Sequence, residues 1–255
     1  MAKEAVVMSA ARSWKRNQLE SLDLIIRIGR KTAFIRERVS GGRPVVIDDI
    51  GLSAQRARAL EATDTVRLYT ATVLSAELLD GLGYEYPMPS VTIYVGRSGK
   101  TVRDHMGKLV GNEIFAHAQT WDRSSSHPLV TTSAIEWTPF VDTYIGEVLV
   151  VDDVISTGTT LEMLKERNAW RFPNALWYAA AWVTRKLTLK GYERLDAALH
   201  VTHPKGRRIP IISLSSLLGS RELAASWAQK HFFPDEGRKL LQALDAVAIE
   251  NRCPG

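Results

Sequence analysis

One short run of residues constrains the fold of this chain more than any other feature. Residues Val148–Val151 are four consecutive apolar residues, three of them β-branched. A strand that is apolar on both faces must be covered on both, as a central strand of a parallel sheet is. Similar apolar runs alternate with helical patterns along the chain: Val45–Ile47, Val66–Tyr69, Val91–Val95, Leu176–Val183 and Ile209–Leu214. The alternation predicts an α/β fold with a mainly parallel sheet flanked by helices.

The two ends of the chain have a different pattern. Ala10–Val39 carries apolar residues at roughly helical spacing with basic residues between them, which predicts a helix ending at Ser40-Gly41-Gly42. Arg221–Lys230 and Asp235–Ile249 predict two closing helices. We therefore expect three parts: an N-terminal helical extension (residues 1–40), an α/β core (41–190) and a C-terminal hood (191–255).

Bulk composition narrows the function only slightly. The chain has 255 residues, a formal net charge of +5 and a pI of about 9.3, which suits an anionic small molecule or nucleic acid without separating the two. The single cysteine, Cys253, allows no disulfide within the chain, and no apolar run approaches a membrane span. These features predict a cytoplasmic protein with no membrane partner.

The residues after the central run carry the strongest functional signal. Asp152 and Asp153 follow it directly, and a loop of small hydroxyl residues and glycine, Ser156–Thr160, comes before the next predicted helix. Ligands of parallel α/β sheets bind beyond the carboxyl ends of the strands. Backbone N–H groups, hydroxyls and a helix N-terminus together suit a phosphate, whereas paired carboxylates suit sugar hydroxyls or a magnesium ion. The pattern predicts a ligand that contains both a phosphate and a polyol.

The thirteen residues Val148–Thr160, VLVVDDVISTGTT, resemble the signature of type I phosphoribosyltransferases. The resemblance implies that Ser156, Thr157, Gly158, Thr159 and Thr160 hold the 5-phosphate of phosphoribosyl diphosphate. It also implies that Asp152 and Asp153 contact the ribose and, through ribose or water, Mg²⁺. The activity implied is transfer of the phosphoribosyl group to a nucleobase-like acceptor, with release of pyrophosphate, by a homodimer.

A second pair of acids tests how specific this signal is. Asp48 and Asp49 also follow an apolar run, but no Thr-Gly loop comes after them, and the bulky Gln55 and Arg56 stand where small residues would surround a phosphate. This pair is therefore interpreted as a strand end with a capped helix behind it.

A transferase of this kind must also bind the pyrophosphate leaving group. Gly96, Arg97, Ser98, Gly99 and Lys100 follow the predicted strand Val91–Val95 and precede a helical stretch, Thr101–Leu109. A glycine-rich loop between a strand and a helix, with two cations, is typical of an anion site. We assign these five residues to pyrophosphate.

The polar, serine-rich run Ala118–His127 lies between the two predicted phosphate loops. The resemblance implies a closing segment here that excludes water from the reaction. Within it Arg123 is a catalytic candidate that could reach the pyrophosphate. Asp122, or Glu136 further along the chain, could act in proton transfer. Ser156 stands where enzymes for 6-oxopurines usually have an aspartate, which disfavours that subfamily and leaves the acceptor open.

Two alternatives remain open. A regulator with the same fold would bind a phosphoribosyl ligand without catalysis, and the basic pI leaves room for nucleic acid, although no helix-turn-helix or aromatic RNA-binding motif is present. A diphosphokinase that makes phosphoribosyl diphosphate has a similar acidic motif, but it needs an ATP site, which the sequence does not reveal.

Overall fold

The computed structural model describes residues 7–8, 24–28, 31–83, 89–109, 111–116, 146–203 and 205–252. The chain forms two compact units: unit 1 comprises Met1–Val39 and Ser75–Val201, and unit 2 comprises Ser40–Leu74 and Thr202–Gly255. These boundaries differ from the expected ones. Residues 40–74 fold with the C-terminal segment, and residues 191–201 belong with the core.

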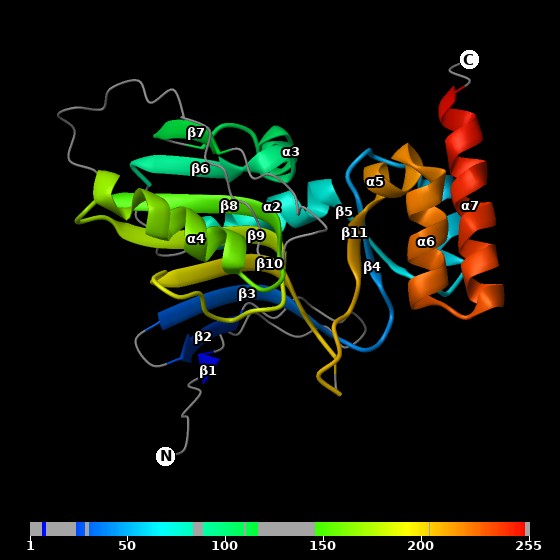
Figure 1. Cartoon of the computed structure of the whole chain (residues 1–255), viewed down its shortest axis with the longest axis horizontal. Coiled ribbons are helices and arrows are strands. Elements are labelled where there is room, and N and C mark those ends of the chain that lie inside the picture. The colour runs from blue at the N-terminus through cyan, green and yellow to red at the C-terminus, as the bar shows by residue number, and fades with distance from the viewer. Residues whose placement is uncertain are drawn as a thin grey trace. The chain divides into compact units, whose positions relative to one another are not determined.

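Unit 1 is built on a sheet whose strand order is β1-β2-β3-β10-β9-β8-β6-β7 (Figure 1). The strands are β1 (Val7–Met8), β2 (Leu24–Ile28), β3 (Lys31–Ser40), β6 (Val91–Val95), β7 (Asn112–Ala116), β8 (Glu147–Ile155), β9 (Leu176–Thr184) and β10 (Arg194–Thr202). All neighbouring strands from β10 to β7 pair in parallel, whereas β1, β2 and β3 form an antiparallel meander. The predicted α/β class with a mainly parallel sheet is confirmed.

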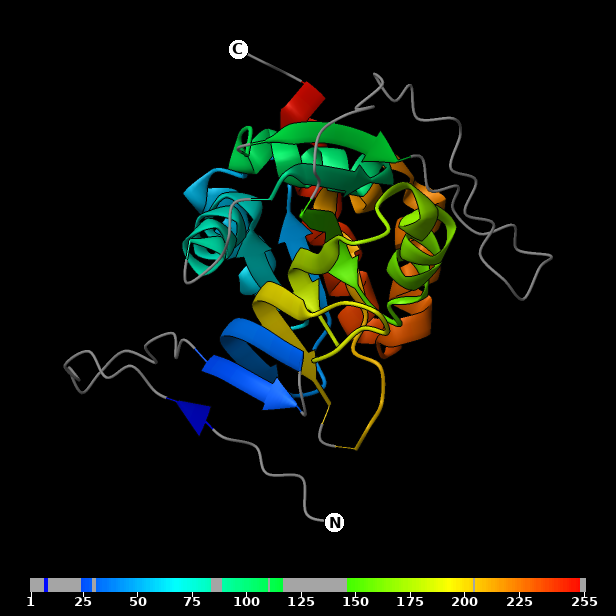
Figure 2. The ribbon, with the colours of Figure 1, turned by 90° about the vertical axis from the view of Figure 1, so that its left-hand side faces the viewer.

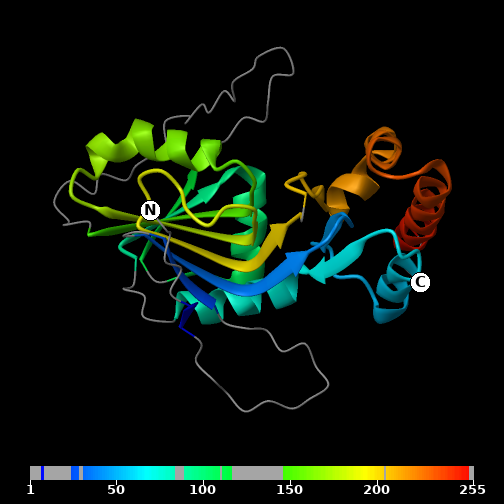
Figure 3. The ribbon, with the colours of Figure 1, turned by 90° about the horizontal axis from the view of Figure 1, so that it is seen from below.

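Helices cover both faces of this sheet. Helix α4 (Thr159–Asn168), which continues into the short 3₁₀ helix η1 (Ala169–Arg171), lies on one face. Helices α2 (Ala71–Leu82) and α3 (Gly96–Met106) lie on the other, as Figures 2 and 3 show. Because β8 is covered on both sides, its central residues Val148–Val151 are all buried, as their apolar run predicts.

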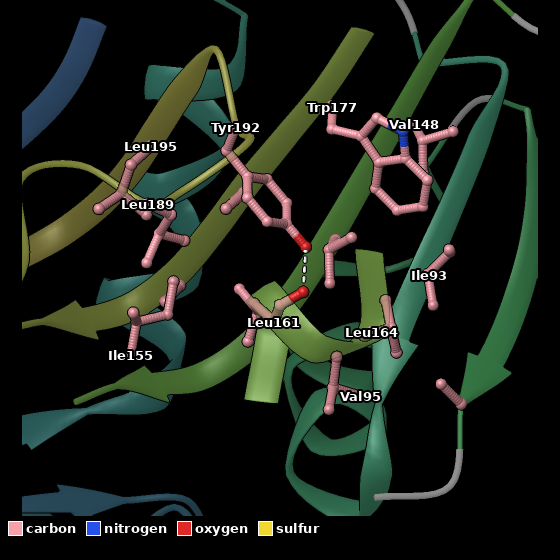
Figure 4. Packing of buried hydrophobic residues seen from close by; sticks show 14 of the residues in the cluster. Ile93, Val95, Val148, Ile155, Leu161, Leu164, Trp177, Leu189, Tyr192 and Leu195 are labelled. Carbon is pink, nitrogen blue, oxygen red and sulfur yellow. Dashed lines mark hydrogen bonds between the residues drawn. The ribbon is translucent and has the colours of Figure 1, made fainter. Parts of the chain in front are cut away.

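Between α4 and the sheet lies a core of buried apolar residues from both elements (Figure 4). Leu161 and Leu164 of α4 belong to one buried cluster with strand residues such as Ile93, Val95 and Val148. Two large aromatic side chains, Trp177 and Tyr192, fill the same layer. The Tyr192 hydroxyl donates a hydrogen bond to the carbonyl of Leu161 at 2.7 Å, which satisfies a polar group that burial would otherwise leave costly.

The predicted N-terminal helix is wrong where the structure describes this region. Leu24–Ile28 and Lys31–Ser40 are the antiparallel strands β2 and β3, with Ile25 opposite Phe34. Ala33, Phe34 and Ile35 are all buried, and three consecutive buried residues fit a strand covered on both faces better than one stripe of a surface helix. Residues 9–23, 29 and 30 lie outside the described part of the chain.

Unit 2 has a small parallel sheet of strand order β11-β4-β5, formed by β4 (Val45–Asp48), β5 (Arg67–Thr70) and β11 (Ile211–Ser213). Its helices are α1 (Ala54–Glu61), α5 (Leu214–Gly219), α6 (Arg221–His231) and α7 (Pro234–Arg252). Val46, Leu60, Trp227 and Leu240 belong to its apolar core. The two predicted closing helices are confirmed as α6 and α7. Among the described residues no helix is long and apolar enough to cross a bilayer.

Candidate functional site

The two acids of the central motif lie inside strand β8 rather than after it. Strand β8 runs on to Ile155 because β9 continues to pair with it, with Asp152 opposite Ala181 and Ile155 opposite Thr184. Asp152 is 9% exposed and Asp153 is half-buried. The two carboxylates therefore lie near the carboxyl end of β8, in a part of the strand that is still paired with β9. Water screens their charges poorly there.

The structure joins the predicted pyrophosphate segment to these acids. Ser98 Oγ donates a hydrogen bond to Asp152 Oδ1 at 2.7 Å, and the N–H of Asp153 donates to the same oxygen at 2.9 Å. Strands β6 and β8 are parallel neighbours, so the residues after β6 meet the end of β8 at one edge. Two segments 54 positions apart in sequence thus form one site.

The five residues assigned to pyrophosphate are the start of a helix, not a loop. Helix α3 begins at Gly96, directly after β6, and not at the expected Thr101. Gly99 is buried against the sheet: a Cβ there would lie 2.8 Å from the Val151 carbonyl oxygen. Gly99 thus serves close packing, whereas Arg97 and Lys100 are exposed beside the helix N-terminus. First-turn N–H groups without intrahelical partners still suit an anion there.

The predicted phosphate loop is shorter than the motif suggests. It consists of Ser156, Thr157 and Gly158, and α4 begins at Thr159, so Thr159 and Thr160 form the first helical turn. Gly158 is the N-cap residue, at a left-handed φ of 83°, and no side chain caps the helix. The hydroxyls of Thr157 and Thr159 lie 3.0 Å apart and both residues are exposed. Hydroxyls and helical N–H groups are therefore gathered at one helix end.

Burial changes the chemistry of both acids. It raises the pKa of Asp152 well above its usual range, and the neighbouring Asp153 raises it further, while the hydrogen bond from Ser98 opposes the shift. Burial also raises the pKa of Asp153, against the effect of its hydrogen bonds. Two adjacent carboxyl groups with raised pKa values gain most from a partner that stabilises their charged form, such as a sugar hydroxyl or a divalent cation.

A magnesium ion fits these residues only in part. Within the described ranges no group of three or more His, Cys, Asp or Glu residues converges on one point. Mg²⁺ is commonly held by one or two carboxylates, several waters and the phosphates of a substrate. Asp152 and Asp153 supply oxygen donors of that kind, so a bound diphosphate would have to complete the coordination.

Sequence reasoning missed the segment after strand β9. A guanidinium N–H of Arg185 donates a hydrogen bond to Ser156 Oγ, at the start of the predicted phosphate loop. Leu189 is packed against Gly158, where a Cβ would come within 2.3 Å of Leu189 Cδ2. The sequence position of Arg185 could have indicated a role in the site. It closely follows the predicted strand Leu176–Val183, and residues beyond the carboxyl ends of parallel strands lie where ligands bind.

The second pair of acids has a structural role, as expected. Asp48 accepts hydrogen bonds from the N–H groups of Ile50, Gly51 and Leu52 in its own turn. Asp49 accepts bonds from the N–H and hydroxyl of Ser215, and Ser53 caps α1. All these acceptor oxygens serve backbone or side-chain donors, so this pair is a strand end with a capped helix behind it.

The predicted closing segment cannot be placed. Ala118–His127, with Asp122 and Arg123, and also Glu136, lie outside the residues that the structure describes. Their predicted roles remain predictions.

No protein-family model and no curated protein matches the chain. Solved structures that it resembles include the xanthine-guanine-hypoxanthine phosphoribosyltransferase of Helicobacter pylori, with 18% identity, 50% of this chain and 84% of that chain covered, and a TM-score of 0.33. The purine phosphoribosyltransferase of Pyrococcus horikoshii has 19% identity, coverages of 64% and 95%, and a TM-score of 0.32. The orotate phosphoribosyltransferase of Aeropyrum pernix has 20% identity, coverages of 57% and 78%, and a TM-score of 0.34. At this level of similarity, a functional assignment depends on the residues of the site itself.

Proposed function

We propose that the chain is a phosphoribosyltransferase that binds phosphoribosyl diphosphate at the edge of the sheet formed by the ends of β6 and β8. The observation that carries the proposal is the hydrogen bond from Ser98 to Asp152. It holds the start of α3, an anion-binding element with Arg97 and Lys100, beside the paired acids. The loop Ser156–Gly158 begins three residues after Asp153, and the N-terminus of α4 follows the loop.

The three parts of this site suit the three chemical parts of the donor, which are the 5-phosphate, the ribose and the diphosphate. The loop and the first turn of α4 suit the 5-phosphate, because N–H groups and hydroxyls are concentrated there. Asp152 and Asp153 suit the ribose 2- and 3-hydroxyls, which donate hydrogen bonds to carboxylates. The start of α3 suits the diphosphate. Asp152 and Asp153 would hold Mg²⁺, which would offset the negative charge of the diphosphate when bound.

In the proposed reaction a nitrogen of the acceptor forms a bond to the anomeric carbon of the ribose. The bond from that carbon to the diphosphate oxygen breaks and pyrophosphate leaves with the bonding electrons. The acceptor nitrogen gives its proton to water or to the released pyrophosphate. The residues described here position the donor and stabilise the charge that develops on the leaving group.

The test is calorimetric titration of the full chain with phosphoribosyl diphosphate and Mg²⁺, followed by a pyrophosphate-release assay against a panel of nucleobases. We expect binding, and turnover with at least one base. In the double variant Asp152→Asn/Asp153→Asn, donor binding should weaken by about 1.5–3 kcal/mol for each charged hydrogen bond lost. Unchanged affinity in that variant would remove the proposal. Binding that depends on the two acids but is followed by no turnover with any base would favour the regulator.

A further inference from the structure

Arg185 occupies a position from which a cation can serve the phosphate loop. It directly follows β9, and its backbone N–H donates a hydrogen bond to the carbonyl of Ile155 at 2.9 Å. This bond holds the backbone of Arg185 beside Ile155, the last residue of β8. Its guanidinium then reaches the hydroxyl of Ser156, the first residue of the loop. The residue is partly buried, so its charge is only partly screened by water.

The charges around the loop explain why a cation is needed. Residues Ser156–Thr160 contain hydroxyls and a glycine but no basic residue. Asp152 and Asp153 precede them, and Glu162 is an acid in the first turn of α4. A phosphomonoester carries close to two negative charges at neutral pH. Without a cation, backbone N–H groups and hydroxyls would have to bind it against the field of three nearby acids.

We propose that Arg185 is a phosphate-binding residue of this loop, contacting the phosphate directly while the loop and the N-terminus of α4 bind its other oxygens. The inference rests on the proposed function, in which this loop holds the 5-phosphate of the donor. Arginine has five N–H donors in a planar fork, so a bond to Ser156 and a bond to a phosphate oxygen are compatible.

The segment that carries Arg185 is held firmly against the loop and α4. Leu189 packs on Gly158, and the N–H of Lys190 donates to Glu162 Oε1 at 2.9 Å. This bond also turns the Glu162 carboxylate toward the Arg185 segment. Because both ends of the contact are ordered before a ligand arrives, the guanidinium loses little freedom on binding phosphate.

The test measures the affinity of the full chain for inorganic phosphate and for ribose 5-phosphate by calorimetry. Arg185→Gln should weaken both ligands roughly 10- to 100-fold, the factor that corresponds to one lost charged hydrogen bond. Arg185→Lys keeps the charge but loses the planar fork, so we expect a smaller loss for both ligands. Lys186→Gln is the matched control, because it removes the same charge from the next, exposed residue. It should change either affinity less than threefold.

Each outcome decides the inference. Wild-type affinity in Arg185→Gln, or equal losses in Arg185→Gln and Lys186→Gln, would overturn it. If Arg185→Gln does not fold, Arg185→Lys takes its place, and wild-type affinity for both ligands in that variant would overturn the inference too. Phosphate binding that depends on Arg185, in a chain that binds neither ribose 5-phosphate nor phosphoribosyl diphosphate, would support the inference and defeat the proposed function. A wild-type chain that binds none of these ligands would overturn both.

Discussion

Gly99 of helix α3 lies directly over the carbonyl of Val151, the residue that precedes the first acid of the site. A Cβ at position 99 would stand 2.8 Å from the Val151 oxygen and 2.9 Å from the carbonyl carbon of Tyr94. Both contacts are with backbone, which cannot move aside as a flexible side chain can. The absence of a side chain at Gly99 is therefore what allows α3 to approach the sheet closely enough for Ser98 to reach Asp152.

Gly99→Ala should consequently damage both the fold and the site. We expect a loss of about 1–3 kcal/mol in the free energy of unfolding, the usual cost of inserting a methyl group into a tightly packed region. Donor affinity should fall as well, because α3 must shift away from β8. Denaturant titration and calorimetry measure the two effects. Gly219→Ala is the control, since nothing lies within 4 Å of a Cβ there; equal stability of the two variants would contradict the packing argument.

Asp152→Asn should stabilise the fold at neutral pH while weakening the donor site. Burial and the neighbouring Asp153 raise the pKa of Asp152 in the folded chain above its ordinary value of 3.8. Its contribution to stability is therefore fully present below that value and is lost as the pH rises. Asparagine keeps an acceptor for Ser98 without the buried charge. We expect a gain in the free energy of unfolding at pH 7.5, where the buried carboxyl is most costly, that disappears near pH 4. Thermal unfolding at both pH values measures it, and a loss of stability at pH 7.5 would refute the prediction.

Asp48→Asn should destabilise the fold and leave the donor affinity unchanged. Its two carboxylate oxygens accept the N–H groups of Ile50, Gly51 and Leu52 at 3.3, 2.9 and 2.8 Å. An asparagine offers a single acceptor oxygen, so at least one N–H loses its partner. The expected cost is about 1–3 kcal/mol in the free energy of unfolding, with donor affinity unchanged. A weakened donor affinity in this variant would mean that the second acid pair also takes part in binding.

Arg97→Ala should distinguish the proposed pyrophosphate site from the proposed 5-phosphate site. Arg97 is exposed beside the start of α3, so its loss should leave the fold intact. Affinity for pyrophosphate and for the full donor should fall about tenfold or more, as expected for one charged hydrogen bond, while affinity for ribose 5-phosphate stays the same. Lys108→Ala, which removes an exposed cation beyond the other end of α3, is the control. Equal weakening of all three ligands in Arg97→Ala would show that the start of α3 does not act as a pyrophosphate site.

His200→Gln should reduce the loss of folding stability that occurs as the pH falls from about 6.5 to about 4. His200 of β10 is 3% exposed, and burial lowers its pKa to about 4 from an ordinary value of 6.5, with a further effect from Arg38. A group with a depressed folded-state pKa contributes stability above its unfolded value that is lost as the pH falls toward 4. Wild-type protein should lose up to about 3 kcal/mol over this interval from His200 alone, and the glutamine variant should not. Parallel profiles for the two proteins would contradict the prediction.

The central strand, its neighbours and the closing helices could be predicted from local pattern alone. Val148–Val151 is apolar on both faces, and only a strand buried between two layers satisfies that pattern. The position of Gly158 could also be predicted from local pattern. The residue before α4 has a left-handed φ of 83°, which favours glycine in any surroundings. Residues 156–158 are therefore identifiable from the local pattern as a short loop that precedes a helix.

The sequence by itself determined the candidate residues for binding a phosphorylated sugar, and tertiary structure decided which of these candidates lie together. Asp48 and Asp152 have the same local pattern, an acid pair at the end of an apolar strand. Asp48 binds the N–H groups of its own turn, whereas Asp152 receives Ser98 from a helix 54 positions earlier. The pairing of β11 with β4, which brings residues 40–74 into unit 2, and the contact of Arg185 with Ser156 are likewise long-range. Hydrogen bonds between strands and across a sheet edge depend on segments far apart in the chain, and no local pattern records which segments will meet.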